Sequence, residues 1–119
     1  MATKQEVESF LNDFKTKMSI FPILFMDNRG KNAQALLDFE ISPIKRIEIL
    51  KKLDVEDYSQ GPIEENMHGL RPMLVFGKDV KGTEAYIKIS MGIANTPAIC
   101  ISFHPAEHSI KYPYKTTKQ

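Results

Sequence analysis

Two alternating stretches between residues 84 and 104 constrain the fold more than any other part of this 119-residue sequence. The first stretch places apolar residues on one side, at Ala85, Ile87, Ile89 and Met91. The second stretch does the same with Ile99, Ile101 and Phe103. A period of two is typical of strands with one buried face and one solvent-facing face. The turn residues at 92–97 favour an antiparallel pairing of the two strands.

The polar faces of these two strands carry the side chains with the most chemistry. Both apolar sets must face one core, because a slip of one residue would turn one set to solvent. A pairing that keeps both apolar sets on one face can then place Tyr86 opposite His104, and Lys88 opposite Ser102. Directly opposed side chains lie roughly 5 Å apart at Cβ. We therefore expect a phenol, an imidazole and an ammonium group to converge on the exposed face of the sheet.

Helical patterns dominate the sequence ahead of these strands. Thr3 and Glu6 form a capping-box pattern, which predicts an amphipathic helix over about residues 4–17. A second helix is expected over 31–40, and Ser42-Pro43 predicts the start of a third. The expected buried positions of these two helices are Ala33, Leu36, Leu37, Phe39, Ile44, Ile47, Leu50 and Leu53. The third helix also has a basic side, either solvated or able to touch RNA phosphates, at Lys45, Arg46, Lys51 and Lys52.

The connecting segments are less regular. Residues 21–26 predict either an edge strand or a buried connector, because Pro22 interrupts an apolar run. The acidic stretch 54–72 is expected to be a long loop, either a lid or a segment awaiting a partner, and it contains His68. An exposed polar histidine is the simplest interpretation of His68, and a role in a site is the alternative.

A third strand is expected at 73–77, joined by a hairpin to the strand that follows. Pairing Val75 with Ile87 on the core face would place Phe76 on the exposed face and Lys78 near the start of the next strand. Helices followed by a meander of strands predict a single α+β domain over residues 1–119. In this fold the N-terminal helices pack on one face of a small antiparallel β-sheet.

Composition bounds the partners and the compartment. The formal net charge is +1, which argues neither for nor against binding to nucleic acid. The single cysteine, Cys100, excludes an internal disulfide and suits a reducing compartment. No apolar run approaches the roughly 18 residues that span a membrane, and the N-terminus lacks the apolar core of a signal peptide. We expect a cytoplasmic protein without membrane contact.

The C-terminal tail is basic and aromatic. After Glu107 the sequence has no acidic residue, and lysines alternate with tyrosines at Lys111, Tyr112, Tyr114, Lys115 and Lys118. Such a tail can hold phosphates and stack on bases. For the last four residues, a frayed, solvated chain end is the alternative.

Motifs for several common site types are missing from the sequence, including GxxxxGK[ST], GxGxxG, CxxC and HExxH. His104, Glu107 and His108 have a spacing that could hold a metal on a helix, but Pro105 follows a strand directly, so no metal or cofactor is expected. The Tyr86 and His104 pair remains open to two interpretations. It is either an ordinary cross-strand pair or the centre of metal-free RNA cleavage, in which an acid and a base assist attack by a ribose 2′-hydroxyl.

The second half of the chain resembles the MqsR family of RelE-like bacterial toxins, over roughly residues 44–104. The motifs that carry the resemblance are Leu53 followed by Glu56-Asp57-Tyr58, the strand 85–89 and the strand 101–104. The resemblance implies a RelE-like fold and metal-independent endoribonuclease action on mRNA. It also implies a cognate antitoxin protein as partner. A non-catalytic module of the same fold, which binds protein or RNA through its exposed sheet, is the alternative.

The resemblance also suggests roles for particular residues. Tyr86 matches the strand tyrosine of the family's active site, Lys88 matches a strand lysine, and His104 stands where the family has a lysine. Gln60 stands about where the family has another lysine, and Met73 or a neighbour stands where it has a glutamine. The expected catalytic residues are therefore Tyr86, His104 and Lys88. The expected substrate-binding residues are Phe76, Lys78, His108, Lys111 and Tyr112.

Overall fold

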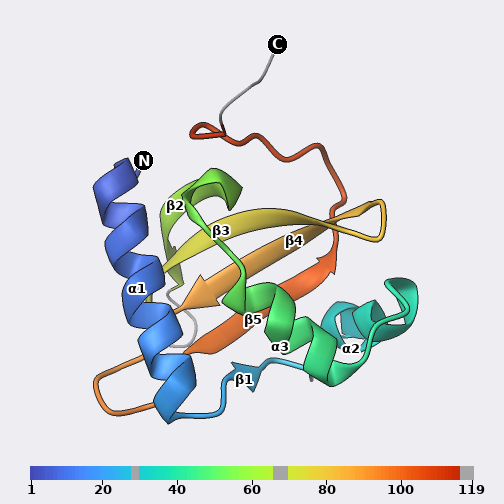
Figure 1. Ribbon diagram of the computed structural model, residues 1–119, viewed down its shortest axis with the longest axis horizontal. Coiled ribbons are helices and arrows are strands. Elements are labelled where there is room, and N and C mark those ends of the chain that lie inside the picture. Colours follow the sequence, from blue (N-terminus) through green and yellow to red (C-terminus); the bar gives the residue numbers. More distant parts are fainter. Residues whose placement is uncertain (28–29, 66–69, 116–119) are drawn as a thin grey trace.

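The computed structural model describes residues 1–27, 30–65 and 70–115, and it places the helices ahead of most of the strands (Figure 1). The helices are α1 (Lys4–Ile20), α2 (Gly30–Asp38), α3 (Pro43–Lys51) and the short 3₁₀ helix η1 (Val55–Asp57). The strands are β1 (Leu24–Phe25), β2 (Tyr58–Glu65), β3 (Leu70–Val80), β4 (Thr83–Ser90) and β5 (Ile99–Pro105). The predicted α+β class is confirmed.

The strands form one sheet in the order β1-β5-β4-β3-β2. Strands β2 to β5 are antiparallel to their neighbours, but β1 runs parallel to β5. The sheet is therefore mixed and not purely antiparallel as predicted. The 21–26 segment contains the edge strand that was one of its two predicted forms. Its backbone bonds run from Leu24 N to Ala98 O (3.0 Å) and from Met26 N to Cys100 O (3.1 Å).

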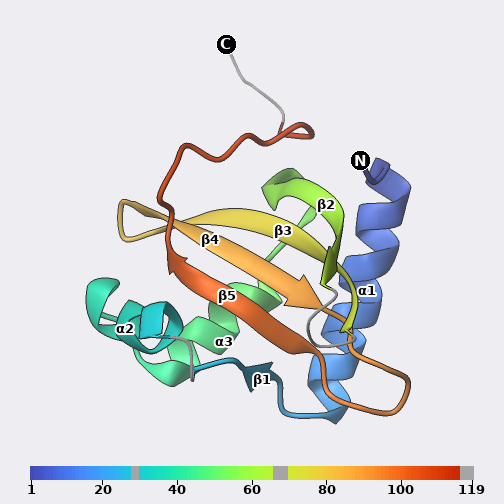
Figure 2. The ribbon, with the colours of Figure 1, turned by 180° about the vertical axis from the view of Figure 1, so that it is seen from behind.

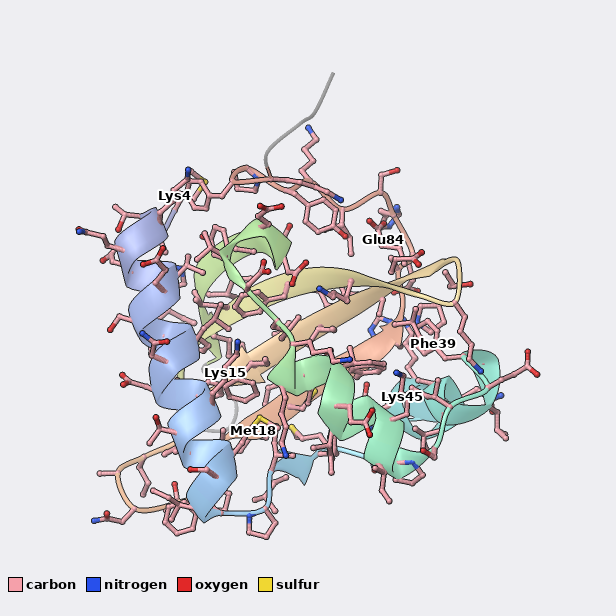
Figure 3. All side chains as sticks on the ribbon, viewed as in Figure 1. Lys4, Lys15, Met18, Phe39, Lys45 and Glu84 are labelled. Carbon is pink, nitrogen blue, oxygen red and sulfur yellow. The ribbon has the colours of Figure 1, made fainter. Side chains whose placement is uncertain are left out.

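Helices α1 and α3 cover one face of the sheet, and none of the described residues forms a helix over the opposite face (Figures 1 and 2). Side chains fill the space between these helices and the sheet (Figure 3). The core they form includes Val7, Leu11 and Phe14 of α1, and Ala85, Ile87 and Ile89 of β4. The alternation predicted for β4 is confirmed, because these three β4 residues are fully buried.

The predicted helix starts are confirmed at α1 and α3. Thr3 Oγ1 accepts from Glu6 N at 3.1 Å, and Glu6 Oε1 accepts from Thr3 N at 2.8 Å, which completes the capping box. Ser42 Oγ accepts from Lys45 N at 3.0 Å, with Pro43 in the first turn of α3. Each cap satisfies backbone donors that the helix leaves without a partner.

The buried sides predicted for α2 and α3 are partly wrong. Leu37 is 72% exposed and Ile44 is 70% exposed, whereas Asn32 and Arg46 are buried. Arg46 lies over the Phe25 ring at 3.5 Å and forms a two-pronged ion pair with Asp27, at 3.0 and 3.1 Å. Arg46 is therefore part of the packing of α3 against β1 and does not belong to a solvated basic side.

The predicted long loop at 54–72 is wrong over the part that the structure describes. Residues 55–65 form η1 and β2, and β3 starts at Leu70. Gly61 makes this possible, since its φ of 118° suits glycine and a Cβ there would lie 2.6 Å from Met73 O. The pairing of β2 with β3 shifts register three times along its length. His68 lies outside the described residues.

The hairpin between β3 and β4 is one residue out of the predicted register. Val80 pairs with Thr83 across a two-residue turn, in which Lys81 and Gly82 both have positive φ. As a result Phe76 pairs with Ile87, and Phe76 is fully buried on the helix side of the sheet. Its predicted place on the exposed face was wrong.

The same shift moves Lys78 to the helix side. Its ammonium group lies 3.0 Å from Asp57 Oδ2 and lines a groove that also contains Ile49 of α3. Asp79 is the residue that pairs with Glu84. Lys78 therefore lies on the opposite face of the sheet from Tyr86, and its predicted role in binding substrate with Tyr86 was wrong.

A bulge in β5 changes the alternation that the sequence predicts there. The register shifts between Lys88 and Ile89, so that Cys100 pairs with Ile89 and joins the core while Ile101 is also buried. Burial raises the pKa of Cys100 from its ordinary 9.0 to about 12. This is the position of a small packed residue and not of a nucleophile.

Cys100 is expected to resist alkylation in the folded protein at pH 8. Only the thiolate form of a cysteine reacts. A pKa of about 12 in place of 9.0 lowers the thiolate fraction of Cys100 at pH 8 roughly 1,000-fold. The rate of iodoacetamide labelling should therefore rise steeply when urea unfolds the chain. The same shift predicts that stability is intact below pH 9 and falls as pH rises toward 12, because the unfolded chain loses its proton first. Equal labelling rates with and without urea would contradict the buried position.

Candidate functional site

Tyr86 and His104 form the centre of the candidate site on the sheet face that carries no helix. They pair directly across β4 and β5, as the sequence predicts. Their ring centroids lie 5.3 Å apart with planes inclined by 20°, so the two rings stack. Both side chains are half-buried. The pairing brings a hydroxyl and an imidazole together at one open position.

Lys88 and Ser102 extend this pair along the same two strands. They are opposite each other, again as predicted, and Ser102 is only 5% exposed. The Lys88 ammonium group lies 5.9 Å from the centroid of the Tyr86 ring. Together these side chains form a polar cluster, which we call the Tyr86 cluster: Tyr86, Lys88, Ser102 and His104.

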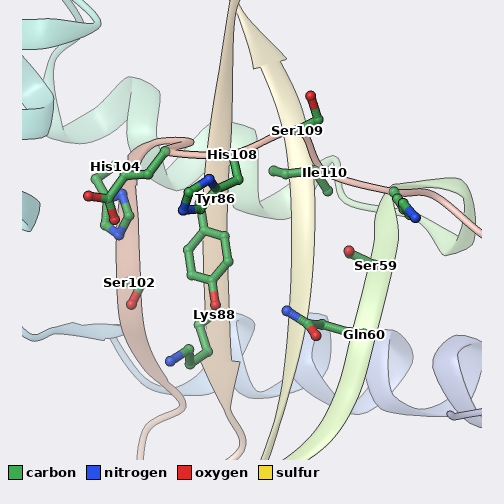
Figure 4. Close-up of a pocket in the computed structure, with 11 residues that line it drawn as sticks. Ser59, Gln60, Tyr86, Lys88, Ser102, His104, His108, Ser109 and Ile110 are labelled. Carbon is green, nitrogen blue, oxygen red and sulfur yellow. The ribbon is translucent and has the colours of Figure 1, made fainter.

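The Tyr86 cluster forms part of the lining of an open cavity of about 630 Å³ (Figure 4). Ser59 and Gln60 of β2 line it on one side, and residues 107–111 of the C-terminal segment line it on another. Figure 4 shows the Gln60 side chain on the same side of the sheet as Tyr86 and Lys88. The cavity is therefore open, and most of the residues that line it, from three strands and one extended segment, are polar.

Glu84 fixes the C-terminal wall of the cavity to β4. Its backbone oxygen accepts from Ala106 N at 2.8 Å, and its carboxylate accepts from Ile110 N (3.3 Å) and from the Tyr112 hydroxyl (2.7 Å). Burial and the bond to Glu84 raise the pKa of Tyr112, so this phenol remains a donor. Tyr112 serves to hold the wall, and it does not line the cavity. The structure therefore does not place Tyr112 in the cavity with the other predicted substrate-binding residues.

Gly77 leaves room for this wall. A Cβ at position 77 would lie 2.3 Å from the Tyr112 hydroxyl oxygen and 2.9 Å from Ile110 Cδ1. Gly77→Ala is therefore expected to displace the wall and to weaken the Tyr112–Glu84 bond, at a cost of about 1–3 kcal/mol. Urea unfolding measures that cost, and limited proteolysis should show earlier cleavage within 106–115. The matched change Gly30→Ala, at a position with open space and without a positive φ, should leave this proteolysis unchanged.

The tail beyond this wall is also held in place, as far as the structure describes it. Tyr114 stacks on Tyr58 at a centroid distance of 5.6 Å, and its hydroxyl donates to Ala2 O at 2.5 Å. Lys115 lies over the Tyr112 ring at 5.1 Å. Tyr112 and Tyr114 are thus engaged within the fold and are not free to stack on bases as placed here. The frayed-end alternative concerned only the last four residues, which the structure does not describe. Lys118 lies outside the described residues.

His104 has a fixed orientation and a defined tautomer when neutral. Its Nδ1 lies 2.9 Å from Pro105 O. A carbonyl oxygen only accepts hydrogen bonds, so Nδ1 carries the hydrogen and Nε2 keeps its lone pair. Nε2 is therefore the nitrogen that can take a proton from a substrate.

The phenol of Tyr86 keeps its proton at neutral pH. Burial raises the pKa of its phenol above the ordinary 10.0. Tyr86 is consequently uncharged at neutral pH and can donate a hydrogen bond or a proton. Side by side, the two rings offer one base and one acid.

The remaining predicted residues, His108 and Lys111, both line the cavity and are exposed. The structure adds residues that the sequence did not single out as part of the site. They are Ser59, Gln60, Ser102, Ser109 and Ile110, together with Glu107, which had been considered only as a metal ligand. Ser59 and Gln60 were missed because β2 was interpreted as a loop.

Glu107 is held by an ion pair with α2. Both of its carboxylate oxygens lie 2.8 Å from Lys31 Nζ. The hydrogen bond from Lys31, followed by its charge, lowers the pKa of Glu107. Among the described residues, no three His, Cys, Asp or Glu side chains gather closely enough to hold a metal ion. The alternative metal site at His104, Glu107 and His108 is therefore not formed.

The site can thus supply a base at His104, an uncharged phenol at Tyr86 and a cation at Lys88 within one open cavity.

Within the described ranges, no helix is both long enough and apolar enough to cross a membrane. Comparisons of the chain with protein-family models, curated proteins and solved structures give no match.

Proposed function

We propose that this protein is a metal-independent endoribonuclease that cleaves mRNA. The observation that supports this most strongly is the stacked pair of Tyr86 and His104, with centroids 5.3 Å apart, inside a cavity that also contains the Lys88 ammonium group. These three groups are of the kinds that cleavage through a ribose 2′-hydroxyl requires. The resemblance to MqsR-like toxins points to the same chemistry.

His104 acts as the base in the proposed reaction. Its Nε2 removes the proton of the 2′-hydroxyl, and the freed oxygen attacks the neighbouring phosphorus. The bond from phosphorus to the 5′-oxygen then breaks, which leaves a 2′,3′-cyclic phosphate on one fragment. The bond between Nδ1 and Pro105 O holds the ring in one orientation while Nε2 takes the proton.

Tyr86 and Lys88 assist at the phosphate. The uncharged phenol of Tyr86 protonates the departing 5′-oxygen, which would otherwise leave as a strongly basic alkoxide. Lys88 stabilises the negative charge that grows on the phosphate oxygens. A half-buried ammonium group is more effective here than one in bulk water, because the effective dielectric constant is lower.

The cavity favours single-stranded RNA. Its walls rise on the β2 side and at residues 107–111, so a base must be turned out of a helix to enter. Gln60, Ser59 and Ser102 offer amide and hydroxyl groups that can bond to the edge of such a base. Duplex RNA should therefore be a poor substrate.

A cognate antitoxin is the partner class that goes with this activity, and the cytoplasm is where the protein would meet mRNA. Both proposals depend on the resemblance at Leu53, Glu56-Asp57-Tyr58 and the strands 85–89 and 101–104. Induced expression is expected to arrest growth, and co-expression of a short neighbouring reading frame should restore it. Normal growth together with intact cellular mRNA would overturn the toxin proposal.

Lys88→Ala tests the proposed activity in the purified protein. We expect a loss of about 10²-fold in the rate of RNA cleavage, because one charge-stabilising group is removed. Lys51→Ala, at an exposed position in the last turn of α3, is the matched control and should cleave at the normal rate. RNA that is bound but left intact by the unmodified protein would instead favour the non-catalytic binding module.

A further inference from the structure

A second groove lies beside His104, on the side of helix α2. It has a volume of about 430 Å³ and is lined by Gly30, Lys31, Gln34 and Asp38 of α2, together with Pro105. His104 and Glu107 complete its lining, and both also line the first cavity. His104 therefore stands at the junction of two neighbouring cavities. We call this second cavity the α2 groove.

The α2 groove carries groups that can recognise a nucleotide. Gln34 Nε2 donates to Asp38 Oδ1 at 3.2 Å, so an amide and a carboxylate lie side by side one helical turn apart. Such a pair offers both donors and acceptors to the edge of an unpaired base. Lys31 also lines the groove, where its ammonium group is paired with Glu107. The groove is thus built of the side-chain types that read bases in single-stranded RNA.

The position of α2 relative to His104 is fixed by buried contacts. Asn32 donates from Nδ2 to Ile101 O at 2.8 Å and accepts at Oδ1 from Phe103 N at 3.0 Å. Phe39, after the end of α2, packs edge-on against Phe103 at a centroid distance of 5.7 Å. These contacts join α2 to β5, the strand that carries His104. They therefore fix the position of the α2 groove relative to the His104 side chain.

The carboxylates near the junction do not exclude a phosphate. Glu107 has both oxygens 2.8 Å from Lys31 Nζ, and the Asp38 carboxylate accepts from Gln34. The negative charge of Glu107 is therefore balanced locally. Lys88 and Lys111 supply positive charge on the other side of His104.

We propose that the α2 groove is a second nucleotide subsite and that Gln34 and Asp38 determine which base it accepts. This inference rests on the proposed endoribonuclease function. An RNA strand with one nucleobase in the cavity lined by the Tyr86 cluster and the next in the α2 groove must pass over His104, which lines both cavities. The phosphate between the two nucleotides then lies at His104, the general base of the proposed reaction. The two cavities hold the nucleotides on either side of the cleaved bond.

Cleavage of an RNA library with random sequence tests the subsite. The ends of the products give the base preference on each side of the cleaved bond. Gln34→Ala and Asp38→Ala are expected to reduce the preference on one side about ten-fold, since a well-placed base contact is worth that much discrimination. The preference on the other side should be unchanged. Leu37→Ala, at a 72% exposed position of the same helix that does not line the groove, is the matched control.

The outcome separates this inference from the proposed function. If all variants cleave with the same preference as the unmodified protein, or lose preference equally on both sides, the subsite is wrong while the nuclease stands. If no RNA is cleaved, binding of a single-stranded 2′-deoxy oligonucleotide decides the matter for the groove. Weaker binding by Gln34→Ala and Asp38→Ala, but not by Leu37→Ala, would then support the subsite in a protein that only binds. Equal binding by all four proteins would reject it.

Discussion

Replacement of His104 by alanine is expected to lower the rate of RNA cleavage about 10²–10⁴-fold, the usual contribution of a positioned acid or base. The substitution removes the Nε2 lone pair that would take the 2′-hydroxyl proton. It also removes the ring that stacks on Tyr86, 5.3 Å away. Initial rates on a single-stranded RNA of defined sequence measure the loss, and thermal unfolding checks that the variant is folded.

His108→Ala is the matched control for this prediction. His108 also lines the cavity, but it is exposed and lies in the C-terminal segment. Its loss should affect substrate binding alone, so we expect a rise in KM with kcat nearly unchanged. If His108→Ala abolished cleavage and His104→Ala did not, the assignment of the base would be wrong.

Replacement of Asn32 by alanine is expected to destabilise the fold by about 2–4 kcal/mol. The Asn32 amide bonds to Met26 O (3.0 Å), Ile101 O (2.8 Å) and Phe103 N (3.0 Å), and its side chain is buried. Removing it leaves buried backbone groups without partners, each at a cost of about 1–3 kcal/mol. Urea unfolding measures the change.

Leu37→Ala serves as the comparison for stability, because Leu37 is on the same helix and exposed. Its effect should stay within about 0.5 kcal/mol, as is usual for surface positions. A loss below about 1 kcal/mol for Asn32→Ala would mean that the amide does not hold α2 to β5. The fixed placement of the α2 groove beside His104 would then lose its support.

The central pair of the site could be predicted from the sequence because it depends on one local pattern. The period of two in β4 sets which residues face the core. The requirement that the apolar residues of both strands face that core sets the pairing of Tyr86 with His104. Tyr86 and His104 lie beyond the β5 bulge, on the stretch where the predicted and observed pairings agree. The bulge itself leaves no pattern in the sequence, so the burial of Cys100 against the core was not foreseen.

Buried polar side chains explain why the helix faces were harder to predict. The pattern assigns apolar residues such as Leu37 and Ile44 to the core. Asn32 and Arg46 occupy the buried positions instead, because each satisfies specific hydrogen-bonding groups on the neighbouring strands and loop. Hydrogen bonds between distant residues carry no periodic signal, so amphipathic spacing alone could not find them.

Strand β2 was missed for a different reason. Gly61 and Pro62 interrupt it, and both residues ordinarily indicate turns. The structure accommodates them through register shifts against β3. That strand carries Ser59 and Gln60, so one wall of the cavity could not be predicted. The one-residue error in the β3–β4 hairpin, which assigned Phe76 and Lys78 to the wrong face, came from the length of the turn.

The most direct test of the central claim is cleavage of an RNA that carries a single 2′-deoxy substitution at the mapped cleavage position. Attack by the 2′-hydroxyl requires that oxygen, so we expect cleavage at this bond to stop while other sites in the same molecule are still cut. The unmodified RNA should give fragments that end in a 2′,3′-cyclic phosphate and begin with a 5′-hydroxyl. Equal cleavage of both substrates, or no cleavage of either, would contradict the proposed endoribonuclease.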